Sequence, residues 1–537
     1  MKDSIIKQLE ESLIELDCYD EDLKISVSTP KNKNFGDLST NIALLLAKKL
    51  NKNPLDIAND IKNKLEKSDL FKTINIANPG FLNFHLNPKS ITNELIEIIN
   101  LNNNYGKNNT FENQKVLVEF VSANPTGPLT VGHGRGAILG DTLSNIFAWN
   151  GYNVDREYYY NNAGRQMRIL GESVKARYLE IQKEGYQFPE DGYEGEYIYD
   201  IANNLSDKFG NTLIDNDTIF KETAEQHIFE NIKNTLSRIN ITFDSFFNEN
   251  TLYENKDIYT VIDQLRAKGL VYEKDDATWF HGTKVGREND RVLIKSSGEP
   301  TYRLPDMAYH IKKIERGYDL CLDIFGADHM DAYPDVMEVV KQLGYDESKI
   351  KVVIHQFISI LNQGKQVKMS TRKATYITLD ELIGEVGSDV VRYFFIMRGV
   401  NSHLNFDLEI AKEKSEKNPI FYIQYAYARI MRILSKNDLV LTNYNLSLLD
   451  QEDEIKLIYK LIEFKEVIIK ISKDMEPQIL ATYLLELASM FHKYYAKNRV
   501  INDNEELSKS RLVFIQSISI VIKNSLKILG ISAPKKM

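Results

Sequence analysis

A glycine-rich segment at residues 122–141, SANPTGPLTVGHGRGAILGD, holds the residue types and spacing best suited to chemistry. It follows the run KVLVEFVSA at 115–123, whose continuous apolar pattern predicts a buried strand. It then leads into a predicted helix that carries His133 near its start. Strand, turn and helix in this order form the first half of a parallel βαβ unit. The free N–H groups and partial positive charge of such a helix start suit a polyphosphate.

The glycines beside His133 fit this interpretation, because a residue without a Cβ lets a flat ligand approach the backbone closely. The imidazole of His133 can donate a hydrogen bond to a phosphate or ribose oxygen. The residues alone leave a second interpretation open. In that one, Gly132, Gly134 and Gly136 only make a tight turn, and His133 is a surface side chain.

The bulk composition bounds the kind of protein that carries this segment. The chain has 537 residues, of which 43% are hydrophobic and 27% charged, as in a globular protein of about three to four domains. The net charge of −9 gives no global nucleic-acid signal, although a local stripe of Lys and Arg is enough for phosphate contacts. Cys18 and Cys321 are too few for a disulfide framework or a thiolate zinc site. Without a signal peptide or a membrane-length apolar run, the sequence predicts a cytoplasmic protein.

The elements that must position the glycine-rich segment belong to a parallel sheet. Strand-like runs at 291–295, 319–325 and 351–360 alternate with helical patterns at 306–316 and 330–343. This alternation predicts a Rossmann-type α/β catalytic domain over residues 110–375, interrupted by an insertion at about 155–290.

Two further units flank this domain. Residues 1–100 combine helical patterns with the strand-like ending INIANPGFLNFHL, and therefore predict a small α+β domain. From 376 to 537 the pattern is almost wholly helical and amphipathic, which predicts an all-α bundle. The predicted fold class is thus a multidomain α/β protein with an N-terminal α+β domain and a C-terminal helical bundle.

The phrase PTGPLTVGH followed by GRGA resembles the nucleotide-binding signature of class I aminoacyl-tRNA synthetases, in the form found in arginyl-tRNA synthetases. Other segments resemble the same family in the expected order along nearly the whole chain. They are FGDLSTNIALLLAKKL, ANPGFLNFHL, YYYNNAGRQM, DGYEGEYIYDIA, GEPTYRLPDMAYH, FGADH, NPIFYIQYAYARI and ILGISAPKKM. The resemblance implies an arginine–tRNA ligase that activates L-arginine with ATP and Mg²⁺ and transfers it to the 3′-terminal adenosine of tRNA(Arg). It also implies a monomer without a structural metal, an N-terminal domain that binds tRNA and a C-terminal bundle that binds the anticodon.

The resemblance assigns roles to particular residues. Thr130, His133, Lys368 and Arg372 are the expected catalytic residues. The expected ATP site comprises Pro128, Thr130, Gly132, His133, Gly136, Asp328, His329, Lys368, Met369 and Ser370. The expected arginine site comprises Glu119, Ser122, Asn124, His133, Tyr302 and Asp306. The expected tRNA contacts are Tyr425, Arg429, Tyr494 and Met537.

The chemistry of the substrates agrees with these assignments. A guanidinium is planar with five donors, so paired carboxylate oxygens are its best partners. Cations such as Lys368 and Arg372 stabilise a departing pyrophosphate. Read without the family, Tyr302 and Asp306 also fit a packing tyrosine and a helix cap, and the segment at 368–373 fits a solvated basic loop.

Two positions depart from the family's pattern. Thr130 stands where the family's signature usually begins with His, and Thr371 stands at the second lysine of the basic loop. A threonine hydroxyl can still donate one hydrogen bond to the ATP phosphates, but it cannot become cationic. Two alternatives to the ligase therefore stay open from the sequence. One is a synthetase-like tRNA-binding paralogue with weakened or lost activation, and the other is a nucleotidyltransferase of the same fold acting on a small molecule.

Overall fold

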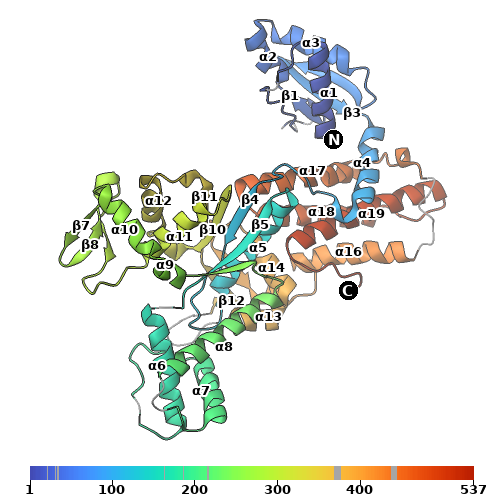
Figure 1. Ribbon diagram of the computed structural model, residues 1–537. Coiled ribbons are helices and arrows are strands. Elements are labelled where there is room, and N and C mark those ends of the chain that lie inside the picture. The colour runs from blue at the N-terminus through green and yellow to red at the C-terminus, as the bar shows by residue number, and fades with distance from the viewer. Residues whose placement is uncertain are drawn as a thin grey trace.

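A central parallel sheet organises the protein, with a small α+β unit before it and a helical bundle after it (Figure 1). The computed structural model describes residues 1–537 except 21, 29, 31, 33, 34, 163, 186, 214–216, 368–376 and 437–443. At residues 3, 217 and 329 it describes the backbone alone. The predicted fold class is confirmed.

The central sheet has five strands in the order β11-β10-β4-β5-β6, and every neighbouring pair is parallel. Its strands and covering helices are β4 (Lys115–Glu119), α5 (Val131–Trp149), β5 (Asn153–Tyr160), β6 (Ser245–Asn248), α11 (Arg303–Glu315), β10 (Leu320–Gly326), η4 (Ala327–His329), α12 (Tyr333–Gln342), η5 (Glu347–Lys349) and β11 (Ile350–His355). Because all strands run the same way, their carboxyl ends lie along one edge, where open α/β sheets bind ligands.

The structure places two of the predicted strand regions differently, and it divides the predicted insertion. The run at 291–295 forms β9 (Arg291–Ile294), which belongs to a separate antiparallel sheet and not to the parallel one. The run at 351–360 divides between β11 and β12 (Ile358–Asn362), and β12 pairs with β13 (Lys365–Gln366) and β14 (Leu404–Asp407). Within 155–290, β5 and β6 are strands of the central sheet, so the inserted elements form two groups and not one.

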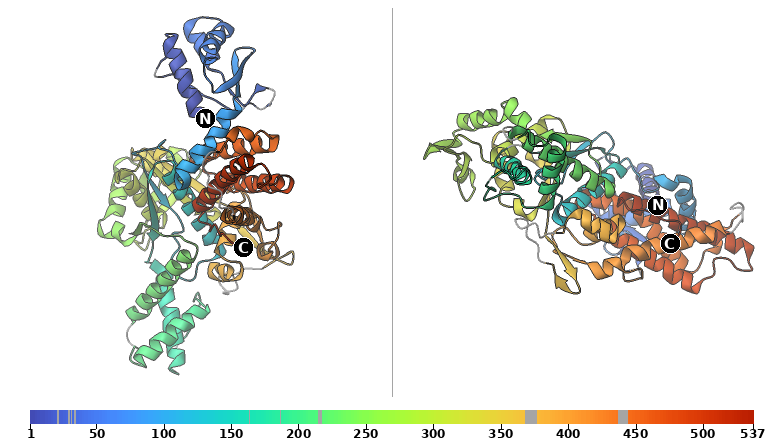
Figure 2. Two further views of the ribbon diagram at one scale, coloured as in Figure 1. Left: turned by 90° about the vertical axis from the view of Figure 1, so that its right-hand side faces the viewer. Right: turned by 90° about the horizontal axis from the view of Figure 1, so that it is seen from below.

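The first inserted group is a helical arm of α6 (Gly164–Ile181), α7 (Glu196–Phe209) and α8 (Asp217–Arg238). This arm and the N-terminal unit project from opposite sides of the sheet (Figures 1 and 2). The second group consists of α9 (Asn250–Glu254), α10 (Asp257–Ala267), β7 (Val271–Lys274), β8 (Ala277–Phe280), η3 (Gly282–Val285) and β9. Its three-stranded sheet lies at the outer end of the molecule, beyond α10 (Figure 1).

The N-terminal unit is an antiparallel sheet with helices packed on it. It comprises α1 (Lys2–Glu15), β1 (Leu38–Thr40), α2 (Ile42–Leu50), α3 (Pro54–Leu65), β2 (Phe71–Ala77) and β3 (Phe81–Leu86). The following helix α4 (Pro88–Leu101) and the turn η2 (Asn102–Asn104) pack against the C-terminal bundle. Both α3 and α4 start with an Asn-Pro pair, in which the asparagine caps the helix and proline fits its first turn.

The C-terminal part is helical apart from β14. Its elements are α13 (Leu379–Val386), α14 (Ser388–Ile396), α15 (Leu408–Lys412), α16 (Pro419–Ser435), η6 (Leu446–Leu448), α17 (Glu452–Asp474), α18 (Gln478–Lys497) and α19 (Glu505–Ile528). In the described part of the chain, no helix has the length and apolar character needed to cross a membrane.

A buried arginine joins this part to helix α5. The Arg392 side chain is fully buried and pairs with Asp141 on α5. The same guanidinium donates to the carbonyl oxygens of Ile239 and Leu529, each at 2.5 Å. Gly530 lies directly on it, so close that a Cβ at that position would overlap the guanidinium. Segments far apart in the sequence therefore meet at one cation.

Candidate active site

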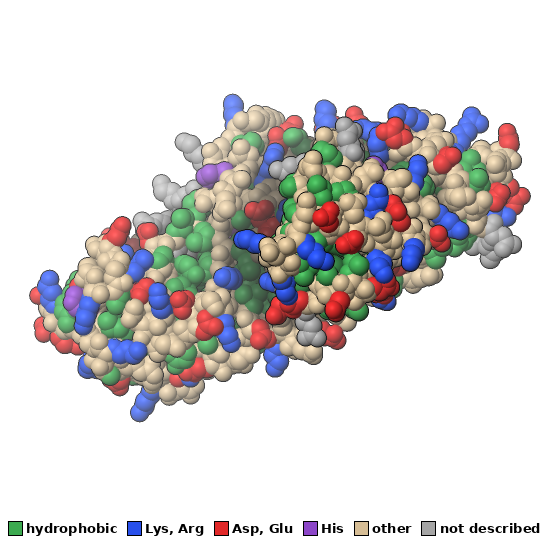
Figure 3. All heavy atoms as spheres, turned by 90° about the horizontal axis from the view of Figure 1, so that it is seen from above, with side chains coloured by type: hydrophobic (Ala, Val, Ile, Leu, Met, Phe, Trp, Pro, Cys, Tyr) green, Lys and Arg blue, Asp and Glu red, His purple; other side chains and the backbone are tan. Residues whose placement is uncertain are grey.

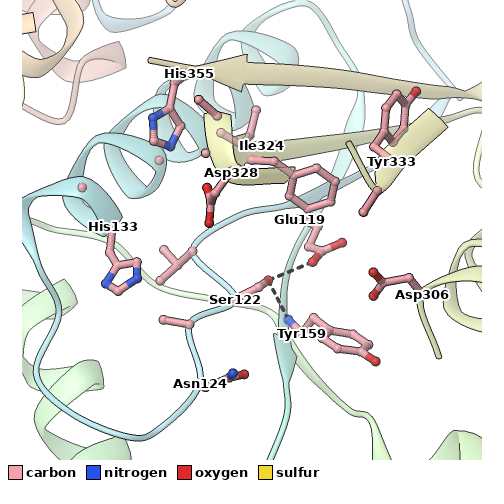
Figure 4. Close-up of a pocket in the computed structure, with 18 of the residues that line it drawn as sticks. Glu119, Ser122, Asn124, His133, Tyr159, Asp306, Ile324, Asp328, Tyr333 and His355 are labelled. Atoms are coloured by element: carbon pink, nitrogen blue, oxygen red, sulfur yellow. Dashed lines mark hydrogen bonds between the residues drawn. The ribbon is translucent and has the colours of Figure 1, made fainter. Parts of the chain in front are cut away.

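A cavity of about 740 Å³ lies at the carboxyl edge of the parallel sheet (Figure 4). The residues that line it come from three groups of elements. They are β4, β5 and the segment after β6; the helices α5, α11 and α12; and β10, η4 and β11. Ten of the residues predicted for the site are among the lining residues, namely Glu119, Ser122, Asn124, Thr130, Gly132, His133, Gly136, Tyr302, Asp306 and Asp328.

The signature helix α5 begins with a reciprocal cap between Thr130 and His133. The backbone N–H of His133 donates to the Thr130 hydroxyl oxygen at 3.5 Å, and the Thr130 backbone N–H donates to His133 Nδ1 at 3.2 Å. Burial lowers the pKa of His133, although Asp328 opposes this shift. The imidazole is therefore neutral near pH 7. Because Nδ1 accepts a hydrogen bond, the ring proton is assigned to Nε2, where it can be donated to a ligand.

The three glycines of this helix have different tasks. A Cβ at Gly134 would lie 2.7 Å from Leu379, so this glycine allows α13 to pack on α5 and does not face a ligand. A Cβ at Gly136 would lie 3.0 Å from His355 Nε2, at the cavity wall. At Gly132 it would meet only the Thr130 hydroxyl at 3.5 Å. Gly132 and Gly136 thus keep the predicted close approach to the cavity, whereas the prediction for Gly134 is wrong.

The exit of β4 is strained and holds Ser122 in place. Val121 and Ser122 have φ angles of 69° and 42°, a left-handed conformation that is unusual for a β-branched residue. The Ser122 hydroxyl donates to Glu119 Oε1 at 2.9 Å and accepts the Tyr159 backbone N–H at 3.1 Å (Figure 4). Ser122 and Glu119 are therefore fixed to β5 before any ligand arrives.

A buried charge network lies behind Glu119. Lys313 is fully buried on α11, and its ammonium pairs with Glu119 and, at 2.6 Å, with Asp323. Burial opposes this ammonium, yet the two carboxylates outweigh it, so the pKa of Lys313 is raised. Asp323 also accepts a hydrogen bond from His310 Nε2 at 3.0 Å. Glu119 thus already has a cationic partner within the protein.

Two other carboxylates at this end of the cavity have no cationic partner among the described residues. Asp306 faces the cavity from α11 (Figure 4), and its carboxylate accepts no hydrogen bond from any described residue. Burial raises its pKa to about 7, with His310 and Lys313 opposing the shift and Glu119 and Glu249 adding to it. Glu249 accepts hydrogen bonds from Tyr159 at 2.7 Å and Asn161 at 2.8 Å, and burial raises its pKa also. This part of the cavity has the character of a site for a cation.

Sequence reasoning missed Glu249 and Lys313. Glu249 follows the four-residue strand β6 and lies in no recognised motif. Lys313 carried a usable signal, because Asp306, His310 and Lys313 follow one another at helical spacings of four and three. These polar side chains share one face of α11 with apolar residues, and such a pattern indicates a buried polar network.

Some predicted residues lie elsewhere. Pro128 is close in sequence to the signature but does not line the cavity. The side chain of His329 and the whole basic loop, with Lys368, Met369, Ser370 and Arg372, lie outside the described residues. The segment just after that loop is joined to the signature turn, because the Leu379 backbone N–H donates to Leu129 at 2.8 Å.

The predicted tRNA contacts differ in their exposure. Tyr425 is half-exposed on α16, Met537 is exposed, and Arg429 packs between the rings of Tyr425 and Tyr495. Tyr494 is buried, and its hydroxyl donates to Glu454 at 2.9 Å. Tyr494 is therefore not available to stack on an RNA base, contrary to the prediction.

Comparison with known proteins agrees with this geometry. Three family models match the chain in order: the arginyl tRNA synthetase N-terminal domain over residues 3–86, the catalytic domain of class I (R) tRNA synthetases over 94–393, and the DALR anticodon binding domain over 423–537. An arginine–tRNA ligase from Desulfotalea psychrophila is 48% identical over 523 residues, which cover 96% of this chain and 95% of the relative. The chain belongs to the arginyl-tRNA synthetase family.

Solved structures of the family have the same fold. A candidate arginyl-tRNA synthetase from Campylobacter jejuni is 31% identical, with a TM-score of 0.78 over 84% of this chain and all of that one. The Thermus thermophilus arginyl-tRNA synthetase aligns over 100% of both chains with a TM-score of 0.76; at 20% identity this shows the fold alone. As a class I synthetase the chain is an ATP-dependent ligase, so the predicted family and enzyme class are confirmed.

Proposed function

We propose that the chain charges tRNA(Arg) with L-arginine in two steps within the cavity at the sheet edge. A carboxylate oxygen of arginine attacks the α-phosphorus of ATP, the bond to the β-phosphate oxygen breaks, and pyrophosphate leaves. The 2′-hydroxyl of the terminal adenosine of the tRNA then attacks the carbonyl carbon of arginyl-adenylate, AMP leaves, and the hydroxyl proton passes to solvent. One observation carries the proposal: two uncompensated carboxylates, Asp306 and Glu249, share a cavity with a helix N-terminus.

The guanidinium of arginine binds between Asp306 and Glu249, with Tyr302 covering it at the cavity rim. Tyr302 is 63% exposed, as a side chain that closes over a ligand would be in its absence. Glu119 lies next to this pair but already pairs with Lys313, so its role is to position Ser122. Ser122 and Asn124 line the cavity between the two ends and contact the amino and carboxylate groups of arginine.

ATP binds at the N-terminus of α5, opposite the arginine end. The Nε2–H of His133, the Thr130 hydroxyl and the backbone at Gly132 offer donors to the phosphates. Asp328 lines the same end, where a carboxylate suits the ribose hydroxyls. Mg²⁺ enters as the ATP complex, because three phosphates concentrate negative charge that oxygen-bound Mg²⁺ offsets.

The basic loop completes the phosphate site. Lys368 and Arg372 supply positive charge to the departing pyrophosphate, and Met369 and Ser370 belong to the same expected ATP-binding motif. Support for these roles comes from the sequence motif and from the backbone bond between Leu129 and Leu379, which joins the end of this segment to the signature turn.

The two outer units, residues 1–100 and 376–537, bind tRNA. The catalytic domain between them spans residues 110–375, as expected from the sequence. Tyr425 and Arg429 on α16 present an aromatic ring and a cation together, a combination that suits an unstacked base and its phosphate. Met537, at the end of the same helical part of the chain, is also exposed. The enzyme acts as a monomer in the cytoplasm, where tRNA charging for translation takes place.

Arginine-dependent exchange of pyrophosphate into ATP, measured with and without tRNA(Arg), tests the function. We expect exchange with arginine and tRNA(Arg) together, and charging of the same tRNA with arginine. Lysine and citrulline should support neither reaction, because the first lacks the planar fork of donors and the second lacks the charge. Charging with lysine and none with arginine would overturn the proposal.

The affinity for arginine should depend on pH through Asp306. Its pKa of about 7 means that the carboxyl is half protonated at that pH in the absence of arginine, and guanidinium binding must displace the proton. We therefore expect the arginine KM to fall as pH rises, by up to about tenfold per unit below pH 7, and to level off above pH 8. Because the folded pKa is raised, ionisation of Asp306 also costs stability as pH rises from about 4 to 7.

The measurement is the arginine KM at saturating ATP and tRNA across this pH range. Asp306→Asn should flatten the profile, and binding of the neutral competitor citrulline should not tighten with rising pH. A profile that keeps its slope in Asp306→Asn would assign the titration to another group.

A further inference from the structure

Three arginines converge on one buried carboxylate beside the cavity. Asp335 lies in the first turn of α12 and is 1% exposed. The Nε atoms of Arg287 and Arg291 each lie 3.0 Å from a different oxygen of this carboxylate, and Arg303 Nε lies at 3.7 Å. The first two arginines come from the inserted sheet near β9, and the third opens α11.

The charges in this cluster do not cancel. Among the described residues, Asp335 is the single ion-pair partner of all three guanidiniums, which leaves two positive charges without a counterion. None of their Nη atoms donates a hydrogen bond to a described residue, and the side chains of Arg287 and Arg291 are about one-third exposed. Elsewhere, on the face seen in Figure 3, Lys and Arg side chains are scattered among Asp and Glu.

The buried Arg392 is a structural arginine with which the arginines of the cluster can be compared. There, both Nη atoms and Nε have carbonyl or carboxylate partners. In the cluster, Asp335 fixes two guanidiniums by Nε and leaves their outward forks free. A guanidinium that is held by Nε alone offers two parallel donors, which match the oxygens of a phosphate. Because the fold already holds these two side chains in place, they lose little conformational entropy when they bind a phosphate.

The cluster lies at the arginine end of the cavity rim. Tyr333 and Val336, on either side of Asp335, line the cavity, and Tyr302 precedes Arg303. Figure 4 shows Tyr333 and Asp306 on one side of the cavity and His133 on the opposite side. In the proposed function the ATP phosphates bind on the side of His133. A phosphate that reaches the cluster from solvent therefore belongs to a different ligand from the triphosphate.

We propose that Arg287, Arg291 and Arg303 bind the phosphates of the 3′-terminal nucleotides of tRNA as its end enters the cavity. This inference rests on the proposed function, since the terminal adenosine must reach the arginyl group. The inserted sheet supplies partly exposed cations at the rim, and a single-stranded RNA end supplies one phosphate per nucleotide to pair with them. Asp335 keeps the cations from repelling one another in the empty enzyme.

Single variants Arg287→Gln and Arg291→Gln test this, because each leaves Asp335 with two guanidiniums. We expect the tRNA KM to rise roughly 5- to 10-fold in each, and the slope of log Kd against log salt to fall by about 0.7 for the lost phosphate contact. Arg266→Gln is the matched control. It lies in the same inserted group, and its guanidinium is compensated by Asp263 at 3.0 Å and Glu273 at 3.5 Å. The control should match the parent chain in both measurements.

A truncated tRNA sharpens the test. Removing the terminal nucleotides should weaken binding to the parent chain, but should weaken binding to Arg287→Gln much less. A rise in the ATP KM in place of the tRNA KM would assign the cluster to ATP, and unchanged values for both would make it structural; either result overturns the inference. If thermal unfolding shows that Arg287→Gln is not folded, Arg287→Lys replaces it in the test. Lysine keeps the ion pair with Asp335 but lacks the paired donors of a guanidinium, so this variant should still raise the tRNA KM. Arginine-dependent exchange at saturating tRNA should persist in every folded variant, which keeps the proposed function separate.

Discussion

Replacing Asp306 by asparagine should lower kcat/KM for arginine by roughly 10- to 100-fold and leave the KM for ATP within about twofold. Asparagine keeps the shape of the side chain but removes the charge that faces the guanidinium. The remaining amide also presents a donor where the cavity requires an acceptor, so donors of the ligand are left unpaired in a site with little water. In the proposed function ATP occupies the other end of the cavity, so its KM should not depend on this side chain.

The measurement is steady-state charging with arginine and ATP varied in turn. Glu315→Gln is the matched control, since Glu315 is also an acid on α11 but is exposed and pairs with Lys312 at 3.0 Å. It should leave both KM values unchanged. Equal increases in the two KM values of Asp306→Asn would show that this residue maintains the cavity and does not select arginine.

Thr130→Val should slow adenylate formation by roughly 5- to 150-fold, with little change in the arginine KM. The hydroxyl oxygen accepts the His133 N–H and lies 3.3 Å from His133 Nδ1, at the end of the cavity assigned to the phosphates. Valine keeps the shape but removes both the cap and the donor, so the imidazole also loses part of its support. Loss of the cap alone costs about 1 kcal/mol of stability.

Thr130→Ser separates the hydroxyl from the methyl group, because it keeps the cap and the donor. We expect its kcat to stay within about twofold of the parent, while Thr130→Val also shows a lower Tm. If single-turnover adenylate formation is as fast with valine as with threonine, position 130 serves packing alone. Phosphate stabilisation would then depend on His133, the helix N-terminus and the basic loop.

The central part of the fold could be predicted because its strands are buried on both faces. β4 and β10 are mostly apolar runs, although β10 contains Asp323, and the long helices of the bundle repeat their apolar residues at helical spacing. β5 and β6 could not be found in this way, because NVDREYYY is mostly polar or aromatic and SFFN is a four-residue strand at the edge of the sheet. The sequence predicted a strand at β9. The sheet to which this strand belongs depends on pairing with other strands, which the local sequence pattern does not encode.

The same limit separates the site residues that were predicted from those that were missed. Motifs identify Thr130, His133 and Asp306, because these positions have fixed neighbours along the chain. Lys313 decides which carboxylate is left for a ligand, yet it pairs with Glu119 from a distant segment. The choice between Glu119 and the pair Asp306 and Glu249 as the guanidinium site therefore needed the three-dimensional arrangement of charges.

The buried Arg392 also sets an order on the making of the active site. Its partners enter the growing chain at very different times, since Asp141 and Ile239 are synthesised long before Leu529. Domains generally fold as they leave the ribosome, starting from the N-terminus. The signature helix α5 can form early. The guanidinium of Arg392, which anchors this helix, still lacks the Leu529 carbonyl and the covering Gly530 until the end of α19 is in place. A ribosome-bound chain that stops before residue 529 should therefore hold its parallel sheet in a looser form. Activity then follows from completion of the bundle, even though the catalytic residues were made first.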